Sequence, residues 1–138
     1  MDMKISLDKG AFMPERAHDL DAGLDLFALD SFMVPAHGYT SVDTGVHIEL
    51  PSGTRGHVCS KSGLNRSHGI TCDGTIDEGY SGSIGVTLHN SSSSDCWFGP
   101  GKKIAQLVVE KILRPDLVLV DKVGGGERGD NGFGSTGE

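Results

Sequence analysis

The sequence lacks any apolar run close to the ~18 residues that a membrane-spanning helix needs, and no signal-peptide core follows its first residues. Cysteine is scarce: the 138 residues include three, without C-x-x-C spacing, and the six histidines lack the spacings of common zinc motifs. We therefore expect no membrane segment, no disulfide framework and no zinc site. An odd number of cysteines without a framework is typical of a reducing compartment, so we expect a cytoplasmic protein.

Positive charge is also scarce. The chain has 12 Lys and Arg against 19 Asp and Glu, and this net charge of −7 disfavours non-specific binding to nucleic acid. Proline is limited to 5 residues, and the 21 glycines follow no G-X-Y period, which excludes collagen-like and proline-rich disordered chains. The length fits one compact domain rich in turns, with no nucleic-acid partner.

Short segments of alternating hydrophobicity lie between the glycines and prolines. This pattern predicts strands at residues 46–50 and 83–89, and a β-branched run predicts a third at residues 117–120. The polar residues 90–95 predict a hairpin loop. Strands separated by turns over one small domain predict an all-β barrel or sandwich. Residues 102–114 differ, because apolar positions at i, i+3, i+4 and i+8 favour an amphipathic helix there.

The last fifteen residues have a composition of their own. Residues 124–138 include seven glycines and one large apolar side chain. Such a segment cannot bury enough surface to offset the entropy of ordering it, so we expect a domain over residues 1–123 and a flexible tail over residues 124–138. Open backbone N–H groups, the hydroxyls of Ser135 and Thr136 and the guanidinium of Arg128 suit this tail to phosphate binding.

A second candidate binding segment is the glycine-flanked stretch at residues 74–82. Alternation of Ile76 and Tyr80 between its glycines predicts a tight β-hairpin. Asp77 and Tyr80, held on a rigid turn, would form one wall of a small-molecule pocket. The alternative is an ordinary hairpin whose acids are solvated.

Five segments, taken in order, resemble the motifs of the trimeric dUTPase family: residues 22–28, 60–64, 74–82, 99–107 and 128–137. Each match is weak alone, but five in the right order with compatible spacing are specific. The resemblance implies a distorted jelly-roll β-barrel with one short helix after the second motif, where residues 62–67 already favour a helix. It also implies that residues 102–114 form a strand, against the helix that their periodicity favours.

The resemblance further implies an activity and an assembly. The reaction is hydrolysis of dUTP to dUMP and pyrophosphate with Mg²⁺, which lowers dUTP and supplies dUMP for dTTP synthesis. Family members are homotrimers with three active sites at subunit interfaces, each built from all three chains. We therefore expect the tail to close over the active site of a neighbouring subunit.

Site roles follow from the same motifs. Asp77 matches the general base that orients and deprotonates the attacking water, and Gln106 matches an amide that contacts the phosphates or this water. Asp25 matches the acid that anchors Mg²⁺ through the water shell of the ion. Tyr80 matches the ring that packs on deoxyribose, and Phe133 matches the ring that stacks on uracil. The other implied substrate-binding residues contribute main-chain or side-chain contacts to uracil and the phosphates: Lys61, Ser62, Gly63, Gly74, Ile76, Arg128, Gly134, Ser135 and Thr136.

Two motifs depart from the family pattern. The second usually reads Pro-Arg-Ser but here reads Ser60-Lys61-Ser62, so a lysine stands where an arginine would offer a bidentate fork. The fourth usually has an acid before its basic residue, whereas this chain has Lys102 and Lys103. Neither change affects Asp77. These departures indicate a variant branch of phage type.

Two alternatives remain open. A dCTP deaminase-like enzyme shares the barrel, but deamination needs a general base near the pyrimidine ring, and the motifs offer no further acid for it. A nucleotide-responsive regulatory binding protein of phage type would act through a protein partner. Retention of Asp25, Asp77, Gln106 and Arg128 together argues against loss of catalysis, though not against a second role.

Overall fold

The computed structural model describes residues 1–132 and 134. These residues form β-structure with one short helix, which confirms the expected all-β, jelly-roll-like fold. The elements follow one another as β1 (Lys4–Leu7), β2 (Leu24–Phe27), β3 (Phe32–Val34), β4 (Tyr39–Asp43), β5 (Val46–Glu49), β6 (Thr54–Cys59), α1 (Ser62–His68), β7 (Ile70–Thr71), β8 (Asp73–Ile76), β9 (Gly85–Asn90), β10 (Cys96–Phe98) and β11 (Lys103–Lys111). No helix in this part of the chain is long and apolar enough to cross a membrane.

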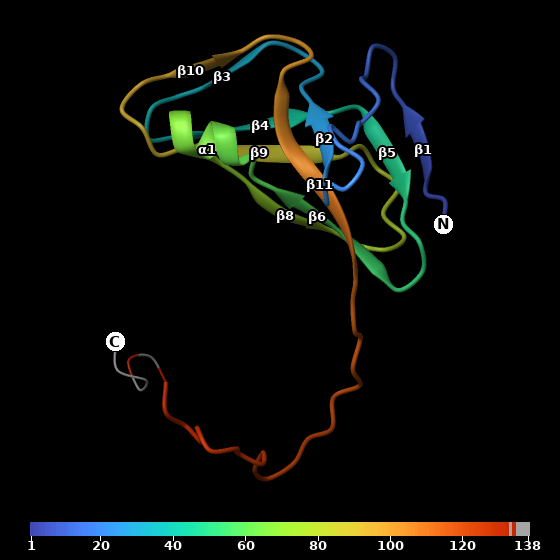
Figure 1. Cartoon of the computed structure of the whole chain (residues 1–138), viewed down its shortest axis with the longest axis vertical. Helices are drawn as coiled ribbons and strands as arrows, with labels where there is room; N and C mark the ends of the chain where they lie inside the picture. The colour runs from blue at the N-terminus through green and yellow to red at the C-terminus, as the bar shows by residue number, and fades with distance from the viewer. Residues whose placement is uncertain (133, 135–138) are drawn as a thin grey trace.

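The strands pair into small antiparallel sheets that share one core. A four-stranded sheet has the order β2-β11-β6-β8, a three-stranded sheet has the order β4-β9-β7, and β1-β5 and β10-β3 form two pairs. Strand β9 shows the pattern that drives this packing, because Val86 and Leu88 are buried while the residues between them are exposed. The largest fully buried side chains include Leu26, Ile70, Ile84, Leu88, Ile104 and Leu107. Figure 1 shows the strands wrapped into one body, with the C-terminal region outside it.

Most of residues 102–114 form strand β11, Lys103–Lys111, as the family resemblance implied and against their helical periodicity. Strand β11 pairs with β2 along one edge and with β6 along the other, so its backbone groups find partners on both sides. A central strand buries apolar side chains in a nearly continuous run, and spacing alone cannot distinguish such a run from one face of a helix. The short helix expected at residues 62–67 is confirmed as α1.

Two predicted hairpins are wrong. Strand β8 pairs with β6, whereas β9 pairs with β4 and β7, so residues 77–84 connect two different sheets. Residues 90–95 likewise lead from β9 to β10, and β10 pairs with β3. The turn residues correctly mark where the chain reverses. They carry no information about which strand the next one joins.

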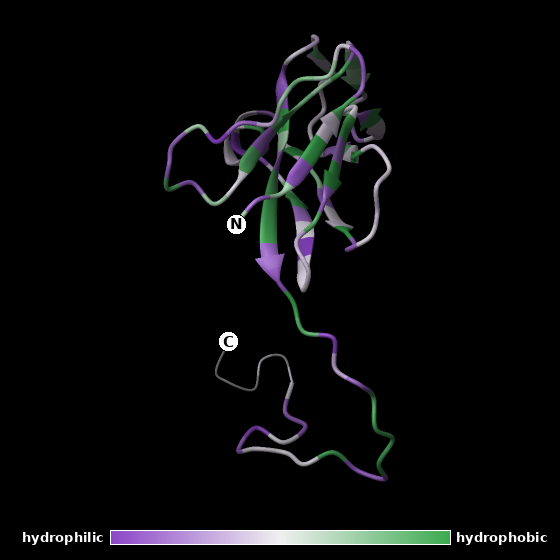
Figure 2. Ribbon diagram, turned by 90° about the vertical axis from the view of Figure 1, so that its right-hand side faces the viewer, coloured by the Kyte–Doolittle hydropathy of each residue, from purple (hydrophilic) through white to green (hydrophobic). Residues whose placement is uncertain are grey.

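The chain leaves the body soon after β11. Residues 115–123, called the arm below, contain no strand, so the strand predicted at residues 117–120 is wrong. Among residues 1–132 and 134, no strand pairs with the arm to complete a ladder of hydrogen bonds, and its apolar side chains are exposed, Leu119 at 99 %. Figure 2 shows hydrophobic stretches along this extended region. The division at residue 123 stays a prediction.

Candidate active site

Asp25 is a buried carboxylate held by two lysines. It lies on β2 and is only 5 % exposed. Lys61 contacts its Oδ1, and the Nζ of Lys103 lies 3.2 Å from its Oδ2. Burial acts to raise the pKa of Asp25, but hydrogen bonds and charges from the two lysines outweigh it and hold the pKa below its usual value. The carboxylate is therefore ionised at neutral pH.

Gln106 lies directly beside Asp25. On β11 it is opposite Asp25 of β2 and opposite Cys59 of β6. Its Nε2 donates to the Ser60 carbonyl at 3.1 Å, which orients the amide. A Cβ atom on Gly23 would lie 2.3 Å from the Gln106 Oε1, so only glycine at position 23 leaves room for this amide. Asp25, Lys61, Lys103 and Gln106 form one group, called the Asp25 cluster below.

The start of helix α1 adjoins the Asp25 cluster. Lys61 is the residue before the helix and has an extended backbone, and Ser62 and Gly63 are the first two helical residues. Backbone N–H groups in the first turn of a helix have no partner within the helix. The Ser62 hydroxyl and these N–H groups therefore add hydrogen-bond donors next to the ammonium group of Lys61.

Asp77 lies in a separate group, on the turn at residues 77–82. The Tyr80 N–H donates to the Asp77 carbonyl at 3.0 Å and closes the turn. The Glu78 carboxylate accepts hydrogen bonds from the Gly53 N–H at 3.1 Å and from Arg114 at 2.6 Å. These two contacts lower the pKa of Glu78. Glu78 is thus an anchor of the turn rather than the solvated acid of an ordinary hairpin.

The ring of Tyr80 lies over Gly82. Its hydroxyl donates to the Ser83 carbonyl at 2.9 Å, and a Cβ atom on Gly82 would lie 2.4 Å from that hydroxyl oxygen. Glycine at position 82 therefore lets the ring lie flat on the backbone of its own turn. Gly74 and Ile76, expected on this wall of the site, lie just before the turn on β8.

The Asp25 cluster and the 77–82 turn are at different levels of the four-stranded sheet. Gln106 is opposite Cys59, which in turn is opposite Asp73, whereas Asp77 follows the other end of β8. Asp77 is four positions after Asp73, which corresponds to roughly 13 Å along a strand at ~3.3 Å per residue. One chain therefore does not bring Asp77 to Asp25 and Gln106.

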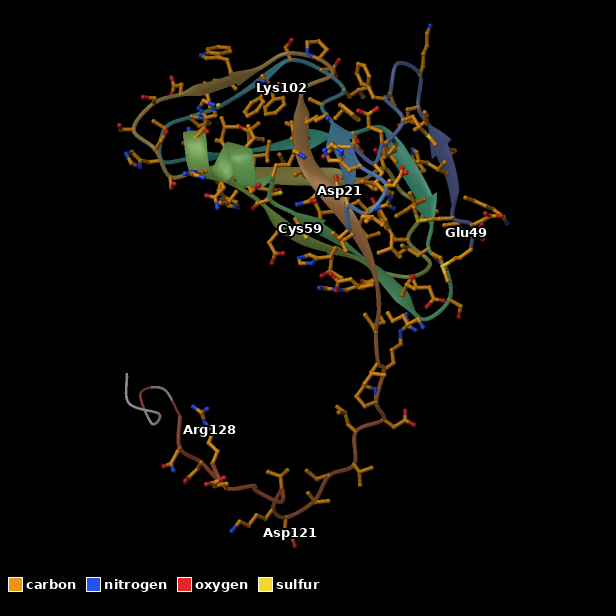
Figure 3. All side chains as sticks on the ribbon, in the orientation of Figure 1. Asp21, Glu49, Cys59, Lys102, Asp121 and Arg128 are labelled. Carbon is orange, nitrogen blue, oxygen red and sulfur yellow. The ribbon has the colours of Figure 1, made fainter. Side chains whose placement is uncertain are left out.

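Arg128 lies apart from both the Asp25 cluster and the 77–82 turn. Its guanidinium donates to the carbonyls of Asn131 at 2.7 Å and Gly132 at 2.9 Å, within the tail itself. Figure 3 shows Arg128 outside the body that carries Cys59. Gly134 lies in a turn of the tail. Phe133, Ser135 and Thr136, expected to bind uracil and the γ-phosphate, lie outside the described residues.

Asp25 is the carboxylate expected to hold Mg²⁺, and the carboxylate of Glu15 shares its partner Lys103 at 3.7 Å. Within residues 1–132 and 134, no group of three or more His, Cys, Asp or Glu side chains is placed to hold a metal ion. Mg²⁺ in nucleotide sites is commonly held by one or two carboxylates, several waters and the phosphates of the substrate. Asp25 is ionised and buried beside Lys61 and Gln106, so this donor set fits Mg²⁺ held chiefly by the substrate.

Three contacts at these sites were missed by the sequence interpretation. Lys103 stands in the fourth motif, and its basic character was the available signal for a partner of Asp25. Arg114 reaches Glu78 from 36 residues away, and no local pattern predicts such a pair. His47 contacts the Ser81 carbonyl at 2.7 Å, again from a distant strand.

Comparisons with known proteins find similarity to one family over nearly the whole chain. The family model described as dUTPase matches residues 9–137. A deoxyuridine 5'-triphosphate nucleotidohydrolase from Gloeothece citriformis is 40% identical over 141 residues, which covers 99% of this chain and 97% of the relative.

Solved structures of phage proteins share the fold. The dUTPase of Staphylococcus bacteriophage 80alpha in complex with dUpNHpp is 28% identical and matches with a TM-score of 0.91 over 99% of both chains. A variant of the dUTPase from phage phi11 of S. aureus is 25% identical, with a TM-score of 0.83 over 88% of this chain and 98% of that one. That phi11 structure describes the coordination of a structural Mg(II) ion.

Proposed function

The chain belongs to the dUTPase family and is a dUTP diphosphatase, and we propose that it forms dUMP and pyrophosphate by Mg²⁺-dependent, in-line attack of water on the α-phosphorus. This mechanism is supported by one observation: the predicted site residues of one chain lie in two separate groups. An ionised, lysine-flanked Asp25 cluster lies at one level of the sheet, and a doubly anchored turn carries Asp77 at another. We expect one substrate to bridge these two groups across a subunit interface.

Asp77 acts as the general base in this proposal. A carboxylate need only be positioned within reach of the water to accept its proton, and the anchors on the 77–82 turn supply that positioning. Tyr80, held over Gly82, packs against deoxyribose on the same turn. A 2′-hydroxyl would clash at this ring, so the proposal predicts discrimination against ribonucleotides.

The Asp25 cluster binds the triphosphate. Lys61 and Lys103 bring two positive charges, Ser62 and Gly63 add donors at the start of α1, and Gln106 contacts the phosphates or the attacking water. When bound, Mg²⁺ supplies positive charge that offsets the charge developing on the leaving pyrophosphate. Asp25 would hold this ion through its water shell, and Lys61 and Lys103 would contact phosphate oxygens.

Substrate selectivity tests the proposed reaction. We expect strong preference for dUTP over dTTP, dCTP and UTP, with turnover lost when Mg²⁺ is removed by chelation. The measurement is pyrophosphate release from the eight common nucleoside and deoxynucleoside triphosphates and from dUTP. Equal turnover of UTP would contradict the role of Tyr80, and ammonia release from dCTP would establish the deaminase alternative.

We also propose a homotrimer with shared active sites. The separation of Asp77 from the Asp25 cluster supports this assembly, because one chain alone does not complete the site. The arm supports it too: Leu117, Val118 and Leu119 are 95%, 79% and 99% exposed, and such apolar segments gain stability when another chain covers them. A tail that follows this arm can reach a neighbouring subunit.

Mixed trimers test the shared site. Trimers made only of D25N chains or only of D77N chains should each be nearly inactive. Equal co-expression gives each site half a chance of an intact Asp25 and half a chance of an intact Asp77, so about a quarter of wild-type activity should return. Each variant co-expressed with itself is the control. Light scattering should give the mass of a trimer, and a mixture no more active than its controls would overturn the sharing of sites.

The cellular role follows from the reaction. Hydrolysis lowers the concentration of dUTP in the cell, and the dUMP formed supplies dTTP synthesis. Three free cysteines support the proposed cytoplasmic setting, because free thiols persist in a reducing compartment. The 80alpha structure belongs to work in which phage dUTPases control transfer of virulence genes, and a regulatory protein partner for this chain stays a prediction on that similarity.

A further inference from the structure

His47 bridges two segments of the chain with its two ring nitrogens. It lies on β5, and its Nδ1 is 2.7 Å from the carbonyl oxygen of Ser81, on the 77–82 turn. Its Nε2 is 3.0 Å from Oδ1 of Asp8, in the loop after β1. The imidazole therefore connects the turn that carries Asp77 and Tyr80 to the β1-β5 pair.

Both partners of the ring are hydrogen-bond acceptors. A carbonyl oxygen and an ionised carboxylate cannot donate, so each ring nitrogen must carry a hydrogen to bond its partner. Only the doubly protonated imidazolium has two N–H groups. A neutral ring has one N–H for two acceptors: the contact to Ser81 is shorter, 2.7 Å against 3.0 Å, whereas the bond to the charged carboxylate of Asp8 is charge-assisted. Deprotonation therefore breaks one arm of the bridge, and when the charge of Asp8 keeps the remaining proton on Nε2, the donor that faces Ser81 is lost.

On this side the turn ends at two other contacts: the Ile84 N–H donates to the Val46 carbonyl of β5 at 2.8 Å, and the Ser83 hydroxyl contacts Asp43. A cavity of about 450 Å³ lies between the turn and the β1-β5 pair, lined in part by Ile5, Ile48, Gly79 and Tyr80. Within residues 1–132, His47 makes the only side-chain hydrogen bond from the β1-β5 pair to residues 79–81. Loss of this bond would free residues 79–82, which then lie between the anchor at Glu78 and the contacts of Ser83 and Ile84.

The charges around His47 are mainly acidic. Asp8 contacts the ring, Asp43 lies near it at the end of β4, and the nearby Glu49 is paired with Lys4 at 3.1 Å. The hydrogen bond to the Ser81 carbonyl is the largest influence that raises the pKa of His47, followed by Asp8. A raised pKa means that the bridge is complete below the ordinary histidine value and is lost as pH rises through the value in the folded protein.

We propose that His47 is a pH-sensitive positioning residue: its doubly protonated ring holds the Ser81 end of the 77–82 turn, and deprotonation releases this end and weakens substrate binding. The proposal rests on the proposed role of this turn in binding dUTP. Because His47 acts through Ser81 and touches no reacting atom, it sets the position of Tyr80 and Asp77 and takes no part in the proton transfer.

Two substitutions of His47 separate its two contacts. In H47N the amide nitrogen takes the place of Nδ1 and can still donate to Ser81, whereas in H47Q it takes the place of Nε2 and can donate only toward Asp8. Neither amide titrates. A purely structural role would make both variants behave alike.

The test is the dissociation constant of the analogue dUpNHpp by calorimetry between pH 6 and pH 9. For wild type we expect this constant to rise about three- to tenfold with pH, the effect of one lost hydrogen bond. H47N should stay flat near the low-pH value, and H47Q should stay flat near the high-pH value. The same wild-type profile in both variants would overturn the proposal.

A second measurement needs no nucleotide. The ring nitrogens of His47 and the amides of Gly79 and Tyr80 should titrate with one midpoint in NMR spectra of the free enzyme, and D8N should move this midpoint to lower pH. Amides that do not follow His47 would overturn the inference while leaving dUTP hydrolysis intact. Absence of dUTP turnover would instead contradict the proposed function, whatever the ring does.

Discussion

Replacement of Asp77 by asparagine is expected to lower kcat for dUTP by about 10²–10⁴-fold and to change the dissociation constant of dUpNHpp only slightly. The amide has nearly the shape of the carboxylate but cannot accept a proton from the attacking water. The anchors of the turn act through Glu78 and Ser81, so the backbone around position 77 keeps its place. The loss should therefore appear in the chemical step rather than in binding.

The control for this variant lies on the strand that leads into the turn. Asp73 of β8 is an exposed acid paired with His57 at 2.7 Å, away from the 77–82 turn. D73N also removes one negative charge, from the strand before the turn, and should retain nearly full turnover. Single-turnover kinetics separate the chemical step from product release for both variants. If D77N keeps kcat within threefold of wild type, Asp77 is not the general base.

Deletion of residues 125–138 should leave the body folded and lower kcat/KM by about 10²-fold or more, because a small misplacement of substrate already costs this much. The described residues of this segment are exposed and pack against no core residue, so their removal uncovers none of it. The deletion removes Arg128 and Phe133, the expected ligands of the γ-phosphate and of uracil. It retains the arm, so assembly should persist.

Ordering this segment costs roughly 1–2 kcal/mol of backbone entropy per residue, so closure requires compensating contacts with substrate. Arg128 now donates to carbonyls of its own tail, and these bonds must be exchanged for phosphate on closure. The measurement combines steady-state kinetics with thermal unfolding and light scattering of the truncated enzyme. The neighbouring E127Q substitution is the matched control and should behave as wild type. Unchanged kcat/KM after the deletion would refute the proposal that the tail closes the site.

The sequence predicts local structure here better than it predicts partners. Alternation along β9 identifies the strand and its buried face because each inward residue meets the core directly. The same reasoning fails at β11, where burial between β2 and β6 determines the conformation. Only the resemblance to a family, which carries information about tertiary pairing, predicted that strand correctly.

The same difference between local structure and distant partners applies to the candidate site. Motif matching placed Asp25, Lys61 and Gln106 in one site, and the structure brings them together through cross-strand pairing. Motif matching could not identify the bonds from Arg114 to Glu78 or from His47 to Ser81, because each joins residues more than thirty positions apart. Such pairs depend on how separate sheets pack together, and the periodicity of the sequence does not predict that packing.

The bond between Arg114 and Glu78 joins the base of the arm to the residue beside Asp77. Arg114 is the last residue before the arm, so its direction depends on where the arm is held. The position of the arm and the order of the 77–82 turn are then thermodynamically linked, and such linkage is reciprocal. In the proposed trimer, a neighbour that captures the arm would favour the anchored turn, and a nucleotide held by the turn would favour capture of the arm. Tighter subunit association would then raise substrate affinity, and bound substrate would strengthen subunit association to the same extent.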